Sequence, residues 1–61
     1  MDNYKRLEEI TNLVNFQLFH LADKRIDELY EEFTQGKIRL TENETDWMFN
    51  LIDRISTELY G

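Results

Sequence analysis

The chain has 61 residues, a length that allows one domain at most. Of these residues 13 are acidic and 7 basic, so the net charge is −6. A chain this short buries only about 60% of its unfolded surface and usually needs a disulfide, a metal or a second subunit for stability. Cysteine is absent, which excludes disulfides and thiolate chemistry, and the excess of acid argues against direct binding to nucleic acid or anionic lipid.

The first predicted element is one long helix from about residue 4 to about residue 35. Asp2 or Asn3 can cap its start, and apolar residues then recur at steps of three and four along its length. The residues around Asp23 contain no Gly or Pro, so we expect the helix to continue through them. The alternative is a break at Asp23, where that side chain would cap a new helix and the chain would form a monomeric three-helix bundle.

A turn over residues 36–41 and a second helix over about 42–60 complete a helical hairpin. Gly36 is suited to the left-handed conformation that ends a helix. Thr41 and Glu44 have the spacing of a capping box, in which each side chain bonds to the other residue's backbone N–H. Ile38 and Leu40 alternate with basic residues, which predicts an extended, half-buried connection. The fold class is therefore all-α.

The two predicted helices differ in length, and this difference favours a homodimer. The long helix would span about 48 Å and the second about 28 Å, so the second cannot cover the apolar stretch from Leu7 to Leu21. Two hairpins with antiparallel long helices would share one core as a four-helix bundle. The predicted dimer core comprises Leu7, Ile10, Val14, Leu18, Leu21, Ile26, Leu29, Phe33, Met48, Leu51, Ile52, Ile55 and Leu59.

Residue types that carry catalysis or bind metals are scarce in this sequence. His20 is the only histidine and Ser56 the only serine, and neither has a neighbouring set of partners. Glu42, Glu44 and Asp46 alternate as in a calcium loop, but Trp47 stands where that loop needs Gly. We therefore expect no enzyme, no metal and no cofactor.

Two sets of residues are candidates for binding a protein partner. The apolar candidates are Leu13, Phe16, His20, Trp47 and Phe49, and the acidic candidates are Glu28, Glu31 and Glu32. An acidic surface on rigid helices could also occupy a basic groove and so mimic nucleic acid. The simpler interpretation of the acidic residues is a solvated helix face.

Part of the chain resembles a known family. Ile26-Asp27-Glu28-Leu29, Lys37, Leu40-Thr41, Asn43-Glu44, Asp53 and Glu58-Leu59 are similar to the Hha/YmoA family of nucleoid-associated modulators. The resemblance spans about half of the chain and implies a helical protein that acts by binding a DNA-binding protein. The turn with Gly36, an aliphatic residue, Thr41 and Glu42 also resembles SHOCT-type oligomerising hairpins.

The expected function follows from size, acidity and the lack of catalytic groups. We expect a cytoplasmic regulator or inhibitor, bacterial or phage-encoded, that binds itself as a homodimer and binds another protein. The alternatives are a nucleic-acid mimic, an Hha/YmoA-like modulator and a purely structural oligomerising hairpin. The most apolar segment, Leu13 to Ala22, is too short for a bilayer span, so no membrane association is expected.

Overall fold

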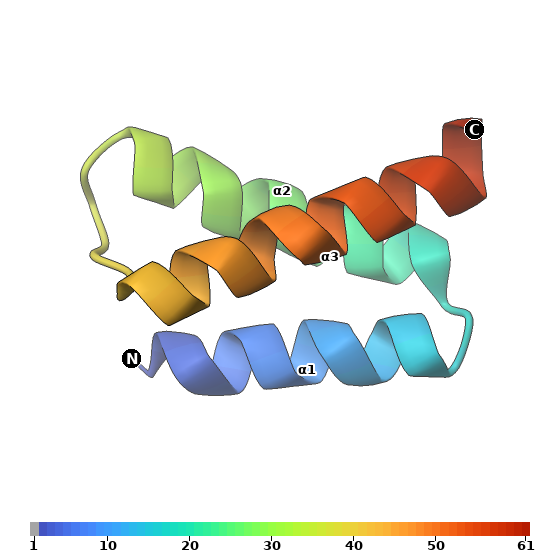
Figure 1. The fold of residues 1–61 in the computed structure, drawn as a ribbon, viewed down its shortest axis with the longest axis horizontal. Coiled ribbons are helices and arrows are strands. Elements are labelled where there is room, and N and C mark those ends of the chain that lie inside the picture. The colour runs from blue at the N-terminus through green and yellow to red at the C-terminus, as the bar shows by residue number, and fades with distance from the viewer. Residues whose placement is uncertain (1) are drawn as a thin grey trace.

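The computed structural model describes residues 2–61, which form three α-helices and no β-strand. The helices are α1 (Asn3–Asn15), α2 (Phe19–Thr34) and α3 (Glu42–Tyr60). Figure 1 shows α2 returning antiparallel to α1, and α3 running back across α2. Each helix packs against both of the others, so the described chain is a three-helix bundle.

The core is built from three residues of each helix at steps of three and four. This spacing places the three side chains on one face of their helix, and the three faces meet. The buried residues are Leu7, Ile10 and Val14 of α1, Ala22, Ile26 and Leu29 of α2, and Met48, Leu51 and Ile55 of α3. Each large aliphatic side chain buried in this way contributes about 1.5–3 kcal/mol to folding.

The prediction of one helix over residues 4–35 is wrong. The chain breaks at residues 16–18, where Gln17 adopts a left-handed conformation with φ of 63°. The break also lies before Asp23, which is inside α2, so the alternative was right about three helices but wrong about the position of the break. Folding α1 back lets one chain bury Leu7, Ile10 and Val14, which an unbroken helix would leave uncovered.

In this arrangement the difference in helix length no longer argues for a shared dimer core. Most of the residues predicted for that core are buried or half-buried within one chain. Leu18 and Leu21 are the exceptions, with exposed fractions of 46% and 50%. The four-helix dimer therefore stays a prediction, and these two leucines are its only proposed core members that lie on the surface of the bundle.

The connection between α2 and α3 has the helix-ending and helix-starting features that the sequence predicts. Gly36 has a φ of 75°, and the Lys37 backbone N–H donates to the Glu32 carbonyl at 2.9 Å, which closes the end of α2. The capping box is confirmed: the Thr41 hydroxyl accepts from the Glu44 backbone N–H at 3.1 Å, and the Glu44 carboxylate accepts from the Thr41 backbone N–H at 2.9 Å. The predicted second helix over residues 42–60 is also confirmed.

Candidate protein-interaction face

A surface that we call the acidic–aromatic face lies along the seam between α2 and α3. Its residues recur at helical spacing on each helix, so they share one side of it. The face comprises Asp23, Asp27 and Tyr30 of α2 with Phe49, Asp53 and Tyr60 of α3. The Tyr30 and Phe49 rings meet edge to face with centroids 6.1 Å apart. The Tyr60 hydroxyl donates to the Asp23 carboxylate at 3.5 Å. Side chains of α2 and α3 therefore contact each other at both ends of the face.

The aromatic rings of this face are exposed although they touch one another. Tyr30, Phe49 and Tyr60 are three of the large apolar residues on the surface of the described chain. The face contains three aspartates and no Lys or Arg. Partial burial raises the pKa of Asp27, and repulsion from Asp23 and Glu31 raises it further. Negative charge is therefore concentrated beside exposed rings without a neutralising cation among the residues that form the face.

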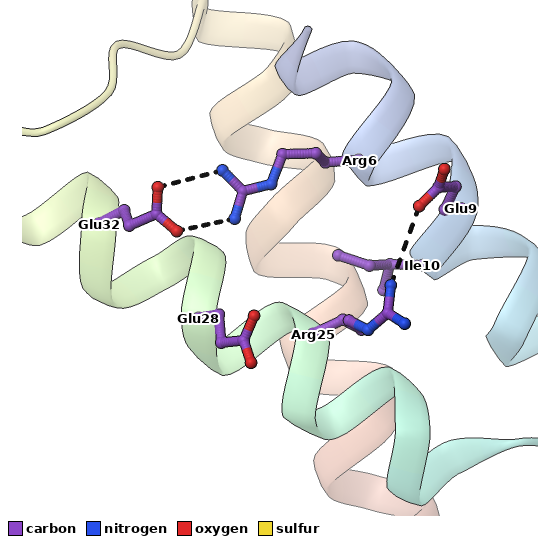
Figure 2. A pocket seen from close by; sticks show the side chains of 6 residues that line it. All are labelled: Arg6, Glu9, Ile10, Arg25, Glu28 and Glu32. Atoms are coloured by element: carbon purple, nitrogen blue, oxygen red, sulfur yellow. Dashed lines mark hydrogen bonds and ion pairs between the residues drawn. The ribbon is translucent and has the colours of Figure 1, made fainter. Parts of the chain in front are cut away.

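A second surface is a groove of about 350 Å³ between α1 and α2. Its lining consists of Arg6, Glu9, Ile10, Arg25, Glu28 and Glu32, as Figure 2 shows. The Arg6 guanidinium donates two hydrogen bonds to the Glu32 carboxylate, at 3.2 and 2.9 Å, and these bonds lower the pKa of Glu32. Arg25 lies 4.0 Å from the Glu9 carboxylate. Sites for small molecules are mostly apolar, whereas this lining is mostly charged and partly self-paired, so we assign it to holding α1 against α2.

Trp47 takes part in a cluster between α1 and α3. Its indole Nε1 donates to the Thr11 hydroxyl at 2.8 Å, and that hydroxyl donates to the Leu7 carbonyl at 2.8 Å. The Tyr4 ring meets the Trp47 ring edge to face with centroids 5.2 Å apart. The indole N–H and much of the ring are thus used within the chain, and Trp47 is half-buried. This placement favours a structural role over the predicted partner-binding role.

The remaining candidates lie on different parts of the bundle. Phe49 belongs to the acidic–aromatic face, and Glu31 is close enough to Asp27 to raise its pKa. Glu28 and Glu32 line the α1–α2 groove on the other side of α2. Leu13 packs against the core, while Phe16 and His20 are exposed at the α1–α2 turn and the start of α2. The structure therefore divides six of the predicted partner-binding residues among three surfaces and packs the other two, Leu13 and Trp47, against the core.

Sequence reasoning missed most of the acidic–aromatic face. The spacing of Tyr30 from Ile26 and Phe33 is also that of a core residue, and Tyr60 stands at the end of the predicted second helix, near the side that carries Phe49. The available signal was a second periodic pattern beside the core stripe on each helix: Asp23, Asp27 and Tyr30, and Phe49, Asp53 and Tyr60. Only the antiparallel packing of α2 on α3 shows that the two patterns adjoin.

Residues 2–61 were also considered as a metal site and as a membrane span, and they have the features of neither. They contain no group of three or more His, Asp and Glu side chains arranged to hold a metal ion. None of their helices combines the length and the apolar character that crossing a bilayer requires.

Comparison with known proteins assigns no relative. No protein-family model matches the chain, and no curated protein or solved structure has significant similarity to it. The resemblance to the nucleoid-associated modulators gains no support from these comparisons, and any function has to be inferred from the chain's own surfaces.

Proposed function

We propose that this chain is a protein-interaction module whose acidic–aromatic face binds a basic segment of a partner protein. The observation that carries the proposal is the position of the exposed Tyr30–Phe49 pair on a face with three aspartates and no basic residue. Exposed aromatic residues are the type most often found at the energetic centre of protein interfaces. The uncompensated carboxylates select for a partner of opposite charge.

The chemistry of the face suits arginine and lysine side chains in particular. The apolar stem of either residue can lie along an aromatic ring while its charged end reaches a carboxylate. A guanidinium can also stack on the ring, and such cation–π contacts contribute about 0.5–2 kcal/mol each. Asp27 lies one helical turn from Tyr30 on α2, and Asp53 lies one turn from Phe49 on α3. One basic side chain could therefore contact a ring and a carboxylate together.

The rigidity of the face favours binding as well. All six of its residues belong to helices that pack on the common core, so little backbone entropy is lost when a partner docks. The net charge of −6 also attracts a basic partner over a distance, an effect that salt weakens. We therefore expect both the association rate and the affinity to fall as ionic strength rises.

The test is a titration of a fluorescently labelled peptide rich in Lys and Arg, with an acidic peptide of the same length as the negative probe. Asp27→Lys and Phe49→Ala are each expected to weaken binding by about tenfold, since each removes one of the two components of the face. Glu58→Lys is the matched control, because it makes the same change of charge on α3 at an exposed residue outside the face. Equal losses in Asp27→Lys and Glu58→Lys would show that net charge alone drives binding and would refute the proposed face.

The nucleic-acid mimic draws less support from the structure. That hypothesis relies on an acidic cluster near the α2–α3 connection, which consists of Asp27, Glu28, Glu31, Glu32, Glu42, Glu44 and Asp46. Arg6 binds the Glu32 carboxylate, and the Glu44 carboxylate is used in the capping box. These carboxylates are therefore not all free for a basic groove. They are also divided between two surfaces, because Glu28 and Glu32 line the α1–α2 groove and Glu31 lies near Asp27 of the acidic–aromatic face.

A further inference from the structure

The ends of α1 and α2 adopt the same capping motif with different residues at the critical position. In α1 the Gln17 N–H donates to the Val14 carbonyl and the Leu18 N–H to the Leu13 carbonyl, both at 2.9 Å. In α2 the corresponding donors are Gly36, at 3.2 Å, and the residue after it, at 2.9 Å. This is the Schellman pattern, whose left-handed position is usually glycine. Gln17 takes that position with a φ of 63°, where an L-residue is disfavoured.

The start of α2 also lacks the features that begin a helix. Leu18 is its N-cap residue and offers no side-chain hydrogen bond, and its first turn has no acidic residue. By contrast, α3 starts with a complete capping box and two acidic residues. No glycine ends α1 and no side-chain cap starts α2, so tertiary packing has to hold the backbone of residues 16–18 in its turn. A continuous helix is the competing local conformation.

Three large apolar side chains at and near this turn are exposed to solvent. Phe16, Leu18 and Leu21 have exposed fractions of 75%, 46% and 50%. In a continuous helix, Leu18 and Leu21 follow Val14 at steps of four and three, so they extend the stripe of Leu7, Ile10 and Val14 that is buried in the closed chain. The two exposed leucines therefore join the core-facing side of α1 only when the turn opens.

From these three observations we infer that two copies of this chain exchange α1 by opening the turn at Gln17. In the exchanged dimer each chain has one helix through α1, residues 16–18 and α2, and its α1 packs on the α2 and α3 of the other copy. The Arg6–Glu32 and Glu9–Arg25 pairs form between chains in place of their present positions within one chain. Short turns under strain favour such exchange, and a two-fold axis sets the exposed leucines of the two copies against each other. The inference does not depend on the proposed partner.

The decisive experiment uses the lack of cysteine in the chain. In the double variant Glu9→Cys, Arg25→Cys, two exposed side chains that face each other across the α1–α2 groove become thiols that a bismaleimide can join. The variant is incubated under reducing conditions at millimolar concentration, its monomer and dimer are separated by size-exclusion chromatography with light scattering, and each fraction is treated with the bismaleimide. We expect non-reducing electrophoresis to show covalently linked pairs from the dimer and single chains from the monomer. Single chains from the dimer fraction, or no dimer up to millimolar concentration, would overturn the inference.

Substitutions at Gln17 give a second readout that keeps the groove intact. Gln17→Gly suits the left-handed turn and weakens a continuous helix, so it should raise the dimer dissociation constant by at least about tenfold, since each dimer contains two such positions. Gln17→Ile disfavours the left-handed turn and should lower that constant. Circular dichroism confirms that both variants are helical. Dissociation constants that are unchanged, or that move in the opposite order, contradict the exchange.

Discussion

Gly36 and Gln17 allow a paired test of the backbone conformation at the two turns. Gly36→Ala places an L-residue at a φ of 75°, and a Cβ there meets no atom within 4 Å, so the effect comes from the backbone alone. The left-handed conformation costs an L-residue about 1–2 kcal/mol, and the loss of glycine from the unfolded chain returns about 0.4–1 kcal/mol. The free energy of unfolding of the variant is therefore expected to fall by about 0.5–1 kcal/mol.

Gln17→Gly reverses the same balance at the other turn. It removes the cost of the left-handed conformation at Gln17 and adds the unfolded-state entropy of glycine. The free energy of unfolding should therefore increase by about 0.5–1 kcal/mol, which means a more stable chain. In a domain of this size 1 kcal/mol corresponds to about 4–8 °C in Tm. Both variants are compared with the unaltered chain by urea unfolding, followed by the fluorescence of Trp47, at low micromolar concentration to favour the monomer. Destabilisation by Gln17→Gly would show that residue 17 is helical and would refute the observed break.

Three other perturbations test separate parts of the bundle. Leu29→Ala removes a fully buried side chain and should cost about 2–5 kcal/mol, enough to lose most of the cooperative helical signal in a thermal melt. Thr41→Ala removes the capping hydroxyl of α3 and should lower the free energy of unfolding by about 1 kcal/mol, measured by urea unfolding. Thr57→Ala is the control, since Thr57 is exposed and lies outside the cap. Because the pKa of Asp27 is raised, ionisation of its carboxyl group lowers the stability of the fold as the pH rises through that pKa. Asp27→Asn should therefore stabilise the chain at pH 7 and not at pH 2. Glu32 has the opposite sign: Arg6 lowers its pKa, so its contribution is present near neutral pH and is lost in acid, as a melt of Glu32→Gln compared across pH should show.

The features that sequence reasoning predicted well are those with local chemical signals. The end of α2 has Gly36 in the left-handed position, and the start of α3 has Thr41 and Glu44 at capping-box spacing. The core residues of all three helices were recognisable because their periodicity does not depend on where a helix breaks. These signals placed the bounds of α3 correctly.

The break between α1 and α2 could not be read from residue preferences. Gln17 is a good helix former, and its neighbours include neither Gly nor Pro. The one faint indication is that Leu13 and Leu18 occupy the positions whose side chains commonly pack together in a Schellman motif. Tertiary packing therefore decides the turn: covering Leu7, Ile10 and Val14 outweighs the cost of a strained residue.

The acidic–aromatic face and the turn at Gln17 lie on parts of the chain that can act independently. The face belongs entirely to α2 and α3, whose connection is fixed by Gly36 and the Thr41 cap. Opening the turn moves α1 and leaves α2 packed on α3, because the hydrogen bonds that change are those of residues 17 and 18. An exchanged dimer would consequently carry two intact faces on one rigid body. A partner with two basic segments could then engage both, and the second contact would form at the high effective concentration that a shared scaffold provides. Self-association would in this way strengthen partner binding without altering any residue that touches the partner.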